Sequence, residues 1–79
     1  SDVYGPELSE WEETVTKTSY EMRSHLSSIL GILNLLADGT ALSDDPHERT
    51  EMTASAYDTT LTLLKVVEDL EKSGRKVLN

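Results

Sequence analysis

Mostly apolar positions recur in steps of three and four along two long stretches of the chain, with a short polar segment between them. In the first stretch these positions are Leu8, Trp11, Val15, Thr18, Met22, His25, Ile29, Ile32 and Leu36. In the second they are Met52, Ala56, Thr59, Leu63, Val66, Leu70, Ser73 and Val77. This spacing is typical of amphipathic helices that pack along a seam of coiled-coil type. The pattern predicts two long helices, at about residues 7–38 and 46–74.

Local signals mark the ends of the first helix. It can begin at Pro6, since proline is tolerated in a first turn, or at a capping box formed by Ser9 and Glu12. Asp38 and Gly39 favour its end, because glycine accepts the left-handed conformation that closes a helix.

The second helix has a stronger start signal. Asp45 is placed to cap it, Pro46 to occupy its first position and Glu48 to close a capping box. Gly74 is expected to weaken or end this helix. The connection of about residues 39–45 is short, and short connections favour antiparallel neighbours.

Residues 1–79 are therefore expected to form one all-α domain, an antiparallel helical hairpin. A single hairpin would leave apolar positions beside the seam in water, so we expect two copies to pair in parallel as a homodimer with a four-helix bundle. The expected core of that dimer consists of Val15, Met22, Leu26, Ile29, Leu33, Leu63, Val66 and Leu70.

Composition narrows the functional classes. Fifteen acidic and seven basic residues give a formal charge of −8, which disfavours nucleic acid and anionic membrane surfaces as partners. There is no cysteine, and no histidine cluster with metal-site spacing, so neither a metal nor another cofactor is expected. With no long apolar run, the segment is expected to be cytoplasmic, either alone or as the cytoplasmic part of an inner-membrane protein.

Tyr20 stands out on this frame because its position points away from the seam. A large aromatic side chain on the outside of a helix buries little surface, so it suggests a partner or a chemical role. Arg23 and Ser27 share its face of the helix, and the three residues are the candidate partner-binding surface.

The segment around Tyr20 resembles a known motif. Residues 20–26 read Tyr-Glu-Met-Arg-Ser-His-Leu and are followed by Ile29 and Gly31. This is similar to the H-box, H-E-[LI]-R-[TN]-P-L-x-x-I-x-G, of the dimerisation and histidine-phosphotransfer domain of bacterial sensor histidine kinases. Residues 64–74 are similar to the end of that family's second helix, so the resemblance spans nearly the whole chain.

Two departures lie at the centre of the box. Tyr20 stands where the family has its phosphoacceptor histidine, Glu21 matches the adjacent acid, and Ser24 matches the position used for phosphatase action. A phenol is a poor nucleophile without a strong base, and its phosphate ester is too stable to pass phosphate onward readily. His25 replaces the family's proline, so a straighter first helix is expected, with His25 a packed residue of the seam.

The resemblance therefore implies a module that is not an enzyme: a dimerising signal relay of a degenerate two-component sensor kinase or phosphorelay protein, unable to autophosphorylate on histidine. The chain also has no glycine-rich or asparagine motif that would hold ATP. Three alternatives stay open. The chain is a free-standing adapter that docks a response-regulator receiver domain or a partner kinase, or a phosphotransfer domain that uses Tyr20, or an engineered histidine-to-tyrosine form of an active kinase.

Overall fold

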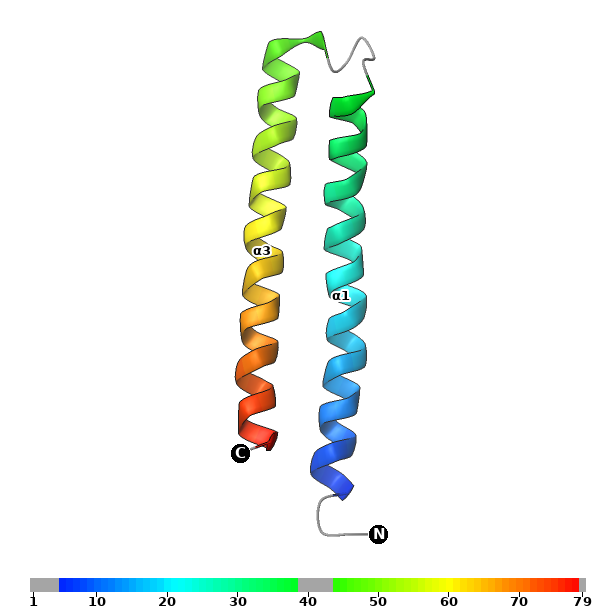
Figure 1. The fold of residues 1–79 in the computed structure, drawn as a ribbon, viewed down its shortest axis with the longest axis vertical. Coiled ribbons are helices and arrows are strands. Elements are labelled where there is room, and N and C mark those ends of the chain that lie inside the picture. The colour runs from blue at the N-terminus through cyan, green and yellow to red at the C-terminus, as the bar shows by residue number, and fades with distance from the viewer. Residues whose placement is uncertain (1–4, 39–43, 79) are drawn as a thin grey trace.

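The computed structural model describes residues 5–38 and 44–78, which form two long α-helices side by side (Figure 1). Helix α1 spans Gly5–Ala37 and helix α3 spans Pro46–Leu78, each with 33 residues. The start of α1 and the end of α3 lie at the same end of the molecule, so the helices are antiparallel. No strand occurs in the described residues. The predicted all-helical hairpin is confirmed.

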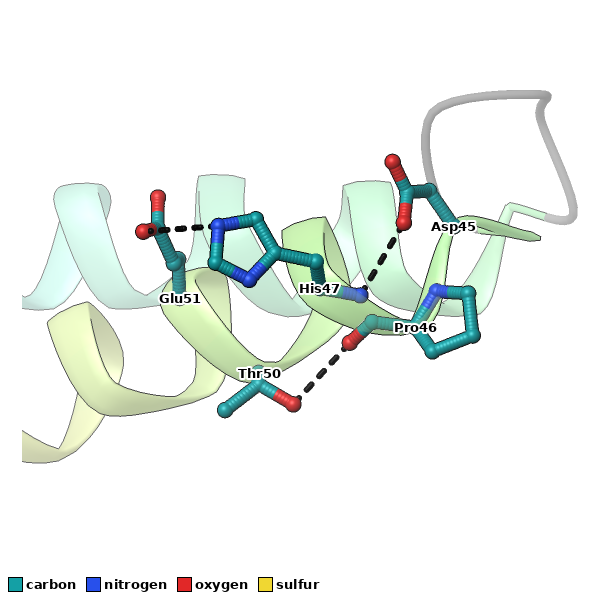
Figure 2. Close-up of polar contacts among 5 residues, drawn as sticks. All are labelled: Asp45, Pro46, His47, Thr50 and Glu51. Atoms are coloured by element: carbon teal, nitrogen blue, oxygen red, sulfur yellow. Dashed lines mark hydrogen bonds and ion pairs between the residues drawn. The ribbon is translucent and has the colours of Figure 1, made fainter.

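Helix α3 begins at the predicted cap. Oδ1 of Asp45 accepts a hydrogen bond from the amide of His47 at 3.0 Å, which satisfies one of the free amides of the first turn (Figure 2). In the same turn the Thr50 hydroxyl donates to the carbonyl of Pro46 at 2.9 Å, and Nε2 of His47 lies 3.2 Å from Oε1 of Glu51. Short-range contacts of the residues around Pro46 therefore set where α3 starts.

Helix α1 starts at Gly5, which places Pro6 in its first turn and Ser9 inside the helix rather than at its cap. It continues without a break through His25, as expected from the absence of a proline there. Gly39 and the rest of 39–43, the predicted helix stop and most of the connection, lie outside the described residues.

A cross-helix contact ties the connected end of the hairpin. Nη1 of Arg49 in α3 donates to the carbonyl of Leu36 in the last turn of α1 at 3.0 Å. A guanidinium at this place satisfies a free carbonyl and is favoured by the negative end of the α1 dipole. It joins the end of α1 to the beginning of α3.

The predicted end of α3 at Gly74 is wrong, because the helix runs on to Leu78. Gly74 is buried, and a Cβ built on it would lie 3.0 Å from Cη2 and 3.3 Å from Cζ2 of Trp11 in α1. Glycine is therefore used here for close approach of an aromatic ring, not as a helix stop. The local signal for a helix end was overridden by a contact between the helices.

The two helices pack along the predicted seam. Its positions are half-buried or buried at Trp11, Val15, Thr18, Met22, His25, Ile29, Ile32, Leu36, Met52, Ala56, Thr59, Leu63, Val66, Leu70, Ser73 and Val77. Leu8, also predicted for the seam, is exposed.

The seam does not amount to a core. Ala56, at 8% exposure, is the one apolar side chain that is fully buried among the described residues. The radius of gyration is 18.0 Å and the molecule measures 59 × 17 × 11 Å, whereas a compact chain of this length has a radius of gyration of about 12 Å. The hairpin is one layer of two helices.

Candidate functional site: the exposed faces of the hairpin

Tyr20 lies on the back of α1, away from α3. Met22 faces α3, and a step of two residues turns about 200° around a helix, so Tyr20 points in the opposite direction. Its side chain is 70% exposed. The predicted outward position of Tyr20 is confirmed.

Tyr20 lines two shallow depressions of the surface. One is lined by Val15, Thr16, Ser19, Tyr20 and Arg23. The other is lined by Ser9, Glu12, Glu13, Thr16, Lys17 and Tyr20. Arg23 and Ser27, the other members of the candidate partner-binding surface, are exposed as well. The phenol therefore stands between a basic and a mainly acidic neighbourhood on an open helix face.

Of the two residues that the resemblance aligns with catalytic positions, Glu21 and Ser24, the acid does not face Tyr20. Glu21 is one residue from Tyr20, about 100° around α1, and it lines a groove between the two helices instead of facing the phenol. Ser24 is exposed. No hydrogen bond or ion pair within the described residues holds the Tyr20 hydroxyl. Within the part of the chain that the structure describes, no base is placed against the Tyr20 hydroxyl.

One side of the hairpin is lined by apolar residues next to the seam. Leu26 and Leu33 follow the seam residues Met22 and Ile29 by four positions, a turn of about 40° in one sense. Leu30, Leu64 and Val67 follow the seam residues Ile29, Leu63 and Val66 by one position and are displaced in the same sense. In antiparallel helices this puts them on one side of the hairpin, which we call the apolar side: Leu26, Leu30, Leu33, Leu64 and Val67. All are exposed except Val67, which is half-buried.

The opposite side, called here the polar side, holds the groove that contains Glu21. The residues that line it are Thr14, Thr18, Glu21, Val66, Asp69, Leu70 and Ser73. Glu21 and Asp69 each precede a seam residue by one position, which turns them away from the apolar side. Two carboxylates and three hydroxyls thus border one side of the seam, and leucines border the other.

The structure divides the predicted dimer core into two groups. Six members lie half-buried in the seam of a single hairpin: Val15, Met22, Ile29, Leu63, Val66 and Leu70. Leu26 and Leu33 are exposed, at 47% and 49%. Of the eight, these two have about half of their surface open to a second copy, so they mark where a dimer contact would have to form.

An exposed apolar pair that the seam pattern does not reveal lies on the back of α3. Tyr57 and Leu61 are exposed and lie four residues apart, and Leu61 precedes Leu64 of the apolar side by three. Leu61 lies about 200° around the helix from Leu63, which faces α1. The spacing of the three residues was the available signal, but the seam pattern overlapped it.

Other kinds of site find no support in the described part of the chain. No three or more histidine or acidic side chains gather there in a way that would hold a metal ion. Neither α1 nor α3 is apolar enough over its length to span a membrane.

Comparisons of this chain with protein-family models, with curated proteins and with solved structures return no match.

Proposed function

We propose that the chain is a non-catalytic dimerisation and signal-relay module of the kind expected in a degenerate two-component sensor kinase or phosphorelay protein. Two hairpins pair through their apolar sides into a four-helix bundle. As such a module it acts in the cytoplasm, on its own or as the cytoplasmic part of an inner-membrane protein.

The observation that carries the proposal is the apolar side itself. A hairpin with a single fully buried apolar side chain in its described residues has little burial to offset the entropy of ordering two long helices. Leu26, Leu30 and Leu33 extend over two turns of α1 on one side, next to Leu64 and Val67 of α3. Covering this side with a second copy buries all five residues and completes the core that one hairpin lacks.

The relay part of the proposal rests on the helices. Both are continuous over 33 residues, so a rotation or bend applied at one end is carried along about 50 Å of helix. The non-catalytic part rests on Tyr20, which stands where the resembling motif has its histidine and has no base directed at it from residues 5–38 and 44–78.

Sedimentation over a concentration series tests the dimer directly. We expect a species of about twice the 8.8 kDa of one chain. Leu26→Glu should lower the dimer fraction strongly, because a charge would be placed inside the proposed interface. Leu61→Glu is the matched control, since Leu61 has the same 47% exposure as Leu26 but lies on the back of α3.

Circular dichroism on the same samples completes the test. Loss of both dimer and helix in Leu26→Glu, with both retained in Leu61→Glu, supports a hairpin that depends on its partner for folding. A parent chain that stays fully helical and monomeric at high micromolar concentration contradicts the proposal.

A second candidate function is favoured by the exposure of Tyr20. In it, the surface of Tyr20, Arg23 and Ser27 docks a response-regulator receiver domain or a partner kinase, and the ring supplies an aromatic anchor. Capture of a receiver domain should be lost on Tyr20→Ala or Arg23→Glu. Tyr57→Ala is the control, because Tyr57 is an exposed tyrosine of the other helix.

A further inference from the structure

The end of the hairpin opposite the connection is joined by one aromatic contact. Trp11 of α1 lies over Gly74 of α3, close enough that a Cβ on Gly74 would lie 3.0 Å from Cη2 of the indole. Gly74 and Ala56 are the two buried residues of the described chain. Trp11 is the single tryptophan of the sequence.

A glycine in this position has a cost that the contact must offset. Glycine destabilises the interior of a helix relative to alanine, and α3 continues for four residues after Gly74. Gly31 in α1 provides the contrast, because a Cβ there would meet nothing within 4 Å. Gly74 is therefore the glycine whose missing side chain makes room for a partner.

The contact between Trp11 and Gly74 forms at only one rotation of α1 about its own axis. The residues on either side of Trp11 in sequence are Glu10 and Glu12, each about 100° away around the helix. Turning α1 by one residue in either sense would bring a glutamate over Gly74 in place of the indole. A charged side chain there would lose the apolar contact and be partly removed from water.

We propose that Trp11 and Gly74 form a rotational lock that couples the beginning of α1 to the end of α3. A turn applied to α1 at this end either carries α3 with it or releases the indole from the glycine. The lock rests on the proposed relay function, since it specifies how the two outer helix ends are coupled.

Three variants and a matched control, Gly31→Ala, test the lock. Gly31→Ala should raise Tm by about 4 to 8 °C, since alanine favours the helix and the space is open. Gly74→Ala should lower Tm and move the Trp11 emission to longer wavelength, because the added methyl displaces the ring. In Trp11→Leu, whose shorter side chain leaves the glycine open, a further Gly74→Ala change should raise Tm instead.

Paired nitroxide labels locate the effect, since the chain has no cysteine of its own. Labels at Glu13 and Lys72 report on the end with the lock, and labels at Asn34 and Ala54 report on the connected end. All four positions are exposed. With labelled chains diluted in unlabelled ones, Gly74→Ala should broaden the distances of the first pair and leave those of the second pair unchanged.

The lock is overturned if Gly74→Ala raises Tm as Gly31→Ala does and leaves the tryptophan emission unchanged. It is also overturned if the two label pairs respond alike. Sedimentation separates this result from the proposed function. If the chain is a dimer but the effect of Gly74→Ala on Tm does not depend on Trp11, the lock alone is rejected. If the chain is a monomer and that effect does depend on Trp11, the dimer alone is rejected.

Discussion

The two sides of the hairpin are built by the same pair of helices but differ in chemistry. The apolar side takes residues that follow a seam position by one or four places, such as Leu26 and Leu64. The polar side takes residues that precede one, such as Glu21 and Asp69. Whether a residue comes just after or just before a seam position in the sequence thus decides which side of the hairpin its side chain lies on.

This difference bears on how the hairpin would associate. Two apolar sides can face each other and exclude water, which is the main driving force for association. Two polar sides brought together would oppose Glu21 and Asp69 with their own copies, and like charges at short distance repel. This difference favours a closed pair of hairpins over an assembly that keeps adding copies, because each hairpin has a single apolar side.

The largest effect is expected from a charge on the apolar side. Leu33→Glu should cost about 2 kcal/mol per chain, and since a twofold dimer carries the change twice, the dissociation constant should rise about 1000-fold. Leu35→Glu is the control, because Leu35 has a similar exposure, 43% against 49%, but precedes the seam residue Leu36 and lies on the other side. Sedimentation equilibrium measures both. Equal effects of the two changes would refute the distinction between the sides.

A change of the opposite kind concerns the polar side. Replacing both Glu21 and Asp69 by leucine should give the hairpin a second apolar side and produce assemblies larger than a dimer. Light scattering with size-exclusion chromatography measures the mass. Glu12→Leu with Lys72→Leu, two exposed positions outside the groove, is the control. Unchanged dimers in the first variant would mean that the carboxylates do not limit association.

A smaller effect is expected at the helix cap, which belongs to neither side. Asp45→Ala removes the acceptor of the His47 amide and should lower the free energy of unfolding by about 1 kcal/mol. Asp45→Asn should retain most of the stability, because asparagine is also a good cap. Urea unfolding followed by circular dichroism measures the difference. A shift in dimer affinity at constant helix content would contradict a purely local role.

The smallest effect is expected from salt. Each chain carries a formal charge of −8, so pairing two copies brings like charges together. Raising ionic strength from 0.05 to 0.5 M should tighten the dimer roughly three-fold, because exposed charges are screened over a shorter distance. Affinity that falls with salt would instead indicate that ion pairs hold the interface.

The seam could be predicted from the sequence almost residue by residue. Steps of three and four assigned Met22, Ile29, Leu63 and Leu70 to the interior face, and all four are half-buried there. The cap at Asp45 was equally accessible, since capping depends on residues within one turn. Leu8 was assigned to the seam by the same pattern and is exposed, because it lies at the outer end of the hairpin.

The faces outside the seam were harder to predict. Tyr20 could be placed outside from its distance to Met22 alone, but the groove that takes up Glu21 needs both helices in their observed register. The exposed residues Tyr57 and Leu61 alternate along the sequence with the seam positions of α3, so periodicity did not separate them from the seam. Whether Leu26 and Leu33 meet a second copy depends on association, which a single chain does not specify.

The sequence by itself determined that this chain forms two helices, where α3 starts and which face of each helix turns inward. These properties depend on periodicity and on contacts within a turn or two, which act before the helices meet. Only the tertiary structure decided that α3 runs through Gly74 and that Trp11 lies over it. A glycine followed by polar residues is locally a helix stop, and only the register between two antiparallel helices places an indole where a side chain would otherwise be.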